Sequence, residues 1–329
     1  MERKNYSISC IRFVSLLLIV ICHFMLYYNY WLAWWFNVGV QIFLCISGYL
    51  YGQRSISDIP AFIIKRIKKI IVPYYIIFVT VAILHYLFVR ECIDLDIFVG
   101  GLLLKKFLNG GEHFWFIPVI TICYAVSILL DRFKEKYVKN SDSFFIFSVV
   151  SVVVALVVFG LVFSYYKTDC IVCFILGYCL GLNDTGKYIP TKFNVGLFSF
   201  FAIIGNGLQI YFSYFRMIII PQELFTLYRV FRYCNHVTLG IILFIVLKLL
   251  FDKVQFRPKM LAFLDKADNY SYEVYLVHQF LILGPFSLME ITGFLPLNLI
   301  IIILLTVALA FLLKLIDSHI FVRNTKKTA

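Results

Sequence analysis

The sequence predicts an all-α membrane protein, a polytopic bundle of about ten transmembrane helices with both termini in the cytoplasm. Of the 329 residues, 62% are hydrophobic and only 15% are charged, whereas soluble domains carry about 25% charged residues. Apolar runs long enough to cross a bilayer, which takes roughly 20 residues, recur along the whole chain. The distribution of lysine and arginine then sets the orientation of these runs.

Ten apolar segments are the predicted spans, and short loops between them predict antiparallel neighbours within one integral domain, 1–329. The spans cover residues 8–30, 36–52, 70–89, 114–131, 143–164, 170–182, 193–213, 233–251, 270–289 and 295–316. Segment 97–108 is also apolar, but Lys105 and Lys106 interrupt it. We therefore expect it to lie at the interface or to re-enter the membrane rather than to span it.

The net charge of +12 would suit a nucleic-acid-binding protein, but its distribution indicates membrane topology instead. With the N-terminus inside, the basic residues concentrate in the predicted cytoplasmic segments 53–69, 132–140 and 252–268 and are sparse in the outer loops. This is the positive-inside pattern, and it accounts for most of the excess charge. The expected location is the plasma or inner membrane, with many passes and no nucleic-acid partner.

Arg12 and His23 form the clearest pair of ionisable residues within a predicted span. Eleven residues at 100° each make three turns plus about 20°, so the two side chains share one helix face about 16 Å apart along the axis. Histidine can act as a general base near neutral pH, and arginine can hold a phosphate or carboxylate through two hydrogen bonds. The structural alternative is an arginine that reaches the headgroups and a histidine that bonds a neighbouring helix.

A basic cluster, Lys65-Arg66-Ile67-Lys68-Lys69, precedes Pro73 and the third span. As a cytoplasmic loop it could bind a polyphosphate group or anionic lipid. On its own, the cluster is explained more simply by ordinary positive-inside charge.

Other polar residues near the span ends are candidates for a site on the outer face or for structural roles. His113 and Trp115 open the fourth span from outside, where a tryptophan also fits an aromatic belt. Glu273 and His278 begin the ninth span, and their spacing of five residues does not place them on one helix face. Arg229, Arg232 and His236, near the outer start of the eighth span, could contact an acidic sugar or phosphate or simply anchor the helix.

Nine cysteines are spread over the spans, and Cys170 with Cys173 forms a C-x-x-C pair. No second pair or histidine cluster accompanies it, so no metal site is predicted.

Five segments carry a resemblance to a known family. They are SCIRFVSLLLIVICHF, with Arg12 and His23; NVGVQIFLCISGYLYG; FIIKRIKKIIVPYY, with Arg66, Lys69 and Pro73; HFWFIPVI; and YSYEVYLVHQFLI, with His278. In this order they resemble the acyltransferase 3 family of integral membrane O-acyltransferases, which modify cell-surface polysaccharides and related glycans. The matches cover roughly residues 5–320. Lys69 stands where the family usually has arginine, Leu44 replaces a phenylalanine, and Gln41 replaces an acidic residue.

The resemblance implies transfer of a short acyl group, such as acetyl, from cytoplasmic acyl-CoA to a hydroxyl of a surface glycan or lipid-linked precursor. It implies that His23 and Arg12 are catalytic, His23 acting as base or carrying the acyl group. Arg66 and Lys69, together with Arg12, would bind acyl-CoA. His113, Trp115, Glu273 and His278 would be acceptor-side or structural residues. The polysaccharide synthesis machinery is a further candidate partner.

Two alternatives remain open at this point. The protein could export a polysaccharide or lipid-linked sugar without acylating it, which requires a polar path through the bundle but no histidine base. It could also be a non-catalytic partner of a polysaccharide synthase, which would tolerate loss of both Arg12 and His23.

Overall fold

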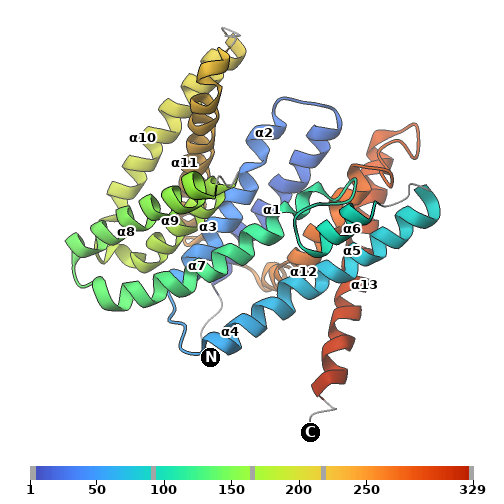
Figure 1. Ribbon diagram of the computed structural model, residues 1–329, viewed down its shortest axis with the longest axis horizontal. Coiled ribbons are helices and arrows are strands. Elements are labelled where there is room, and N and C mark those ends of the chain that lie inside the picture. Colours follow the sequence, from blue (N-terminus) through green and yellow to red (C-terminus); the bar gives the residue numbers. More distant parts are fainter. Residues whose placement is uncertain (1–4, 90–93, 164–166, 216–219, 326–329) are drawn as a thin grey trace. The chain divides into compact units, whose positions relative to one another are not determined.

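The computed structural model describes residues 5–89, 94–163, 167–215 and 220–325 (Figure 1). Within these residues the chain is helical and contains no strand. The elements are α1 Tyr6–Tyr27, α2 Ala33–Phe36, α3 Val38–Gly52, α4 Ile59–Arg66, η1 Ile67–Ile71, α5 Val72–Leu84, η2 His85–Val89, α6 Leu95–Leu102, η3 Glu112–Trp115, α7 Phe116–Tyr137, α8 Ser141–Ala155, η4 Leu156–Val162, α9 Thr168–Leu182, η5 Asp184–Gly186, α10 Thr191–Ile210, η6 Tyr211–Phe215, η7 Gln222–Leu224, α11 Phe225–Phe251, α12 Pro258–Ile282 and α13 Leu295–Thr325.

The predicted class, a helical polytopic membrane protein, is confirmed. Within the described ranges, eight helical segments are long and apolar enough to cross a membrane. They are Tyr6–Tyr27, Ala33–Gly52, Ile59–Val89, Glu112–Tyr137, Ser141–Val162, Thr191–Phe215, Gln222–Phe251 and Leu295–His319. The predicted sixth span is the shorter apolar helix Thr168–Leu182, and the predicted ninth lies largely in α12. The number ten and the cytoplasmic termini stay predictions.

The structure corrects the predicted loop 53–69, because most of it is helical. Asp58 caps α4 by accepting a hydrogen bond of 2.9 Å from the backbone N–H of Ala61, and Pro60 occupies the first turn. From there α4, η1 and α5 follow without a break. A hydropathy pattern misses this helix because its lysines lower the apolar signal, although lysine is itself a good helix former.

Two other predicted connections are also partly helical. α11 begins at Phe225, so Arg229 and Arg232 lie within a helix rather than in an outer loop, and α12 begins at Pro258. Segment 97–108 overlaps the eight-residue helix α6, which is too short to span. The hydroxyls of Tyr74 and Tyr75, on α5, donate to the carbonyl oxygens of Gly101 and Leu102 at its end, at 2.8 and 2.7 Å.

The chain divides into two compact units, each assembled from separate segments. Unit 1 comprises 1–19, 34–57 and 122–261, and unit 2 comprises 20–33, 58–121 and 262–329. Helices α1, α2, α7 and α12 contribute residues to both. The prediction of one integral domain stays a prediction.

Unit 1 is built on the close approach of α3 to α9. Each helix carries a G-x-x-x-G pair, Gly48 with Gly52 on α3 and Gly177 with Gly181 on α9. A Cβ added at Gly48 would lie 2.0 Å from the carbonyl oxygen of Phe174, and similar clashes with backbone atoms occur at the other three glycines. Small residues of this spacing let transmembrane helices pack backbone to backbone, so this interface requires glycine.

Unit 2 is held together by polar contacts of α12. The Tyr272 hydroxyl donates to the carbonyl oxygen of Ile70 in η1 at 2.7 Å. Glu273, which is buried, forms an ion pair of 2.7 Å with Lys314 on α13. Buried charges in an apolar setting need such partners, and these two bonds fix α12 against η1 and α13.

Candidate active site

Three histidines that are far apart in the sequence meet within unit 2. His23 comes from α1, His113 from η3 and His278 from α12. The centroids of the His23 and His278 rings are 4.9 Å apart, and the His113 ring lies 6.3 Å from the first and 5.5 Å from the second. His113 and His278 are buried and His23 is half-buried. The three rings therefore form one compact group, defined here as the histidine cluster.

The hydrogen bonds of His278 assign the protons in this cluster. Its Nδ1 lies 2.8 Å from the carbonyl oxygen of Tyr275 and 3.1 Å from that of Val274. A carbonyl oxygen only accepts, so Nδ1 carries the proton and Nε2 of the neutral ring carries the lone pair. Nε2 lies 2.9 Å from Nδ1 of His23, which must therefore be the donor.

The consequence is that His23 is held in a single tautomer. Because Nδ1–H of His23 donates to His278, Nε2 of the neutral His23 ring carries its basic lone pair. In the serine hydrolases a buried carboxylate fixes a histidine base through Nδ1 in the same way. Here a neutral imidazole backed by main-chain carbonyls occupies that position. The arrangement can remove a proton from a hydroxyl and return it to a leaving group.

His113 is fixed to α12 through its other nitrogen. Nε2 donates to the carbonyl oxygen of Leu276 at 3.2 Å, and the Tyr275 hydroxyl donates to the main-chain carbonyl of His113. The buried Nδ1 of His113 has no hydrogen-bond partner among the described residues. An unsatisfied buried acceptor is costly, so this lone pair is suited to accept a hydrogen bond from a bound molecule.

Glu112 and Gln279 also hold η3, which carries His113, against α12. One carboxylate oxygen of Glu112 accepts from Nε2 of Gln279 at 2.9 Å, and the other accepts from the backbone N–H of Gly110 at 3.1 Å. This bridge fixes the position of His113 relative to α12.

A polar opening lies at the C-terminal end of α1, beyond His23. Tyr27 follows His23 by one helical turn, and its hydroxyl donates to Glu290 at 2.5 Å. Tyr28, Glu290 and Thr292 line an open cavity of roughly 480 Å³. Sequence patterns do not point to Tyr27 or Glu290, because Glu290 lies in a connection whose distance from α1 the sequence does not reveal.

The other predicted residues of unit 2 have different neighbours. Glu273 pairs with Lys314, so it and His278 bind different partners. The sequence could have indicated Lys314 as the partner of Glu273, because a lone lysine within an apolar helix usually pairs with another polar group. Trp115 ends η3, is half-buried, and has its ring 6.4 Å from that of Phe116.

The basic residues proposed for a phosphate site are carried by α4 and η1. The half-buried Arg66 has its guanidinium 5.3 Å from the ring centroid of Phe62, and Lys69 is exposed. Through Ile70, η1 is bonded to Tyr272, which precedes His278 by six residues, or about 9 Å of helix. Arg12 is half-buried on the unit 1 part of α1, three turns before His23.

Arg232 and His236 belong to a separate polar group in unit 1. The His236 ring stacks on Trp34 with centroids 4.3 Å apart, and the Arg232 guanidinium lies 5.0 Å from the Trp34 ring centroid. Arg229 is exposed. The predicted choice between helix anchor and ligand contact stays open for these residues. Cys173 donates to the carbonyl oxygen of Gln41 at 3.2 Å, whereas Cys170 lies 3.8 Å from Asp169.

Comparison with family models gives a match that spans residues 5–315. It is the acyltransferase 3 model, described as an acyltransferase domain. Neither the curated proteins nor the solved structures gave a match.

Proposed function

Since the chain belongs to the acyltransferase 3 family, and is therefore a multi-pass membrane acyltransferase, we propose that it moves a short acyl group from cytoplasmic acyl-CoA to a glycan hydroxyl. The acyl group is acetyl, and the acceptor is a cell-surface polysaccharide or its lipid-linked precursor. The protein would act in the plasma or inner membrane, beside the machinery that makes the polysaccharide.

The contact of 2.9 Å between Nε2 of His278 and Nδ1 of His23, from which the tautomer of His23 follows, is the observation that carries this proposal. Nε2 of His23 takes the proton from the acceptor hydroxyl as the oxygen attacks the thioester carbonyl. The C–S bond then breaks, an ester forms, and the departing thiolate takes the proton from the His23 imidazolium. His278 holds the ring throughout by accepting from its Nδ1–H.

Other residues of unit 2 would contact the glycan acceptor and the acyl-CoA donor. The polar opening at Tyr28 and Glu290 offers an aromatic ring and a carboxylate, which are groups that bind sugar rings and hydroxyls. The unpartnered Nδ1 of His113 would accept a hydrogen bond from the acceptor. Arg66 and Lys69 would bind the phosphates of acyl-CoA as charge-assisted donors.

The direct test uses purified protein in lipid vesicles, radiolabelled acetyl-CoA, and glycan extracted from cells that lack the protein. We expect label to enter the glycan as an ester that mild alkali releases. Absence of ester with correctly folded protein would contradict acyl transfer. Movement of the glycan across the vesicle membrane without esterification would instead support the export alternative.

Arg66 allows a test of donor binding. Replacement by methionine is expected to raise KM for acetyl-CoA about tenfold with little change in kcat, because one charge-assisted hydrogen bond contributes about 1.5 kcal/mol. The matched control is Lys259→Met, which removes an exposed charge from the first turn of α12, outside the basic cluster. Equal KM values for both variants and the wild type would contradict a role for Arg66 in binding the donor.

A further inference from the structure

The polar opening at the end of α1 is a cavity of roughly 480 Å³ that lies within unit 2. Tyr28, which directly follows α1, lines it from one connection, and Glu290 and Thr292 line it from the connection between α12 and α13. Asn298, in the first turn of α13, adds a further polar group. A ligand can bind only to those polar groups that the fold itself leaves unsatisfied.

Asn298 and Thr292 satisfy each other. Asn298 is buried, and its amide nitrogen donates to the carbonyl oxygens of Met289 at 2.7 Å and of Thr292 at 3.0 Å. Its amide oxygen accepts from the backbone N–H of Thr292 at 3.0 Å and from the Thr292 hydroxyl at 2.5 Å. These bonds tie the connection to α13, so the backbone on both sides of Glu290 is fixed.

Glu290 keeps capacity for a ligand. One oxygen of its carboxylate accepts from the Tyr27 hydroxyl at 2.5 Å. The other oxygen, Oε2, has no hydrogen bond to any described residue, and the side chain is exposed. Because a carboxylate can accept about four hydrogen bonds, Glu290 can accept from the hydroxyl groups of a bound molecule.

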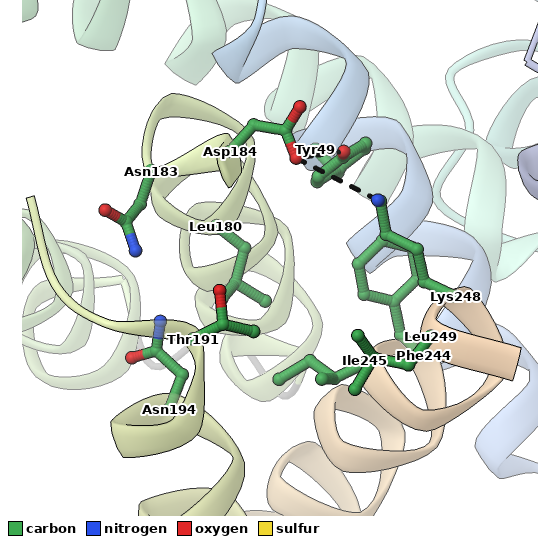
Figure 2. A pocket seen from close by; sticks show the side chains of 10 residues that line it. All are labelled: Tyr49, Leu180, Asn183, Asp184, Thr191, Asn194, Phe244, Ile245, Lys248 and Leu249. Carbon is green, nitrogen blue, oxygen red and sulfur yellow. Dashed lines mark hydrogen bonds and ion pairs between the residues drawn. The ribbon is translucent and has the colours of Figure 1, made fainter. Parts of the chain in front are cut away.

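The charge of Glu290 is not compensated by a cation. Among the described residues Glu290 forms no ion pair, and no basic residue lines the cavity. The connections 28–32 and 283–294 contain neither lysine nor arginine. Asp184 in unit 1 is a contrasting case, because it accepts from the Tyr49 hydroxyl at 2.7 Å and lies 3.9 Å from the Lys248 ammonium (Figure 2). Glu290 therefore leaves its cavity with a negative charge.

Tyr27 links this carboxylate to the helix that carries His23. It follows His23 by four residues, so the two side chains share one face of α1, about 6 Å apart along the helix axis. The ring of Tyr28, which is 46% exposed, has its centroid 5.1 Å from that of Tyr27. The carboxylate and an exposed aromatic ring therefore lie one helical turn beyond the proposed base.

We propose that Glu290 determines which acceptor sugar is used, and that the sugar residue bound in this cavity carries no negative charge. This inference rests on the proposed acyl transfer. Hydroxyl groups of the sugar donate to Oε2 of Glu290, and the ring of Tyr28 contacts the apolar face of the sugar. A sugar acid or a phosphorylated sugar is disfavoured, because it brings a second negative charge to a carboxylate that has no cation beside it.

Acceptors that differ only in charge test this selection. The assay is label transfer from acetyl-CoA by the full-length protein in vesicles, with glycan extracted from cells that lack the protein. One portion of the glycan is carboxymethylated and another is hydroxyethylated to the same density, so the added groups are similar in size and differ in charge. We expect KM for the carboxymethyl glycan to be about fivefold higher, the effect of one charge interaction at an exposed site, with similar kcat.

Glu290→Gln removes the charge and keeps the size of the side chain. KM should become equal for the two derivatives, and KM for the underivatised glycan should rise about fivefold while KM for acetyl-CoA stays unchanged. The matched control is Glu223→Gln, which removes an exposed carboxylate from η7 in unit 1 and should change none of these values. Equal melting temperatures in detergent exclude a folding defect.

Tyr27→Phe tests the position of the carboxylate without changing its charge. It removes the hydrogen bond to Glu290, so KM for the underivatised glycan should rise about threefold, whereas the preference for the hydroxyethyl derivative should persist.

The inference and the proposed function fail in different ways. Equal KM values of the wild-type protein for the two derivatives would overturn the selection by charge, as would an unchanged difference in Glu290→Gln, and both results leave acyl transfer intact. Location of the native ester on an acidic sugar by NMR would also overturn it. Absence of label from all three glycans would instead contradict acyl transfer, and the inference with it.

Discussion

Replacement of His23 by glutamine is expected to lower the rate of acyl transfer by a factor of about 100 to 10,000, the usual contribution of a general base. Glutamine keeps a similar size and can still donate to His278, but it cannot take a proton from a hydroxyl near neutral pH. The measurement is the ester content of the surface glycan by NMR, together with label transfer by the purified variant in vesicles.

The control for this variant is His319→Gln. His319 is an exposed histidine on α13, whose Nδ1 lies 2.8 Å from the carbonyl oxygen of Leu315, and its replacement should leave the ester content unchanged. Equal amounts of both variants in the membrane, and equal melting temperatures in detergent, exclude a folding defect. Ester at the wild-type level in His23→Gln would show that another group removes the proton.

His278 should matter because it fixes the tautomer of His23. His278→Leu removes the acceptor of the Nδ1–H bond, so the His23 ring can rotate and place its proton on either nitrogen. The expected loss in kcat is about 10- to 100-fold, similar to the loss of other groups that orient a functional histidine. KM for acetyl-CoA should change little, because His278 acts through His23 rather than through the donor.

The glutamine variant at the same position separates orientation from packing. His278→Gln offers a side-chain carbonyl oxygen near the place of Nε2, and this oxygen can accept from His23. It should therefore recover part of the activity that His278→Leu loses. If both variants fold and are equally impaired, or if the leucine variant is fully active, the assignment of His278 as a positioning residue is wrong.

The sequence alone predicted the features that depend on a single segment rather than on contacts between segments. Lipid demands helices whose backbone bonds are satisfied internally, so the apolar runs were sufficient to predict the class of fold. The positions of Arg12 and His23 on one helix face follow from helical periodicity. The order of five motifs predicted the family, which the match over residues 5–315 confirms.

Some helix boundaries were predicted wrongly because the prediction used apolar runs and not the local signals of a helix start. The helix that begins at Ile59 was assigned to a loop, because a search for apolar runs passes over Lys65, Arg66, Lys68 and Lys69. The Asp58 cap and Pro60 were visible in the sequence and would have indicated a helix start.

Only the tertiary structure determined which residues, distant in the sequence, bond to one another. His278 bonds His23 rather than Glu273, Glu273 finds Lys314, and His113 is held by the backbone of α12. Composition and periodicity describe the faces of single helices, whereas these pairs depend on how the helices pack against one another. In an apolar interior each buried polar group must find a partner among its spatial neighbours. The sequence therefore identifies the ionisable residues within the helices, whereas the packing of the helices determines which groups they bond.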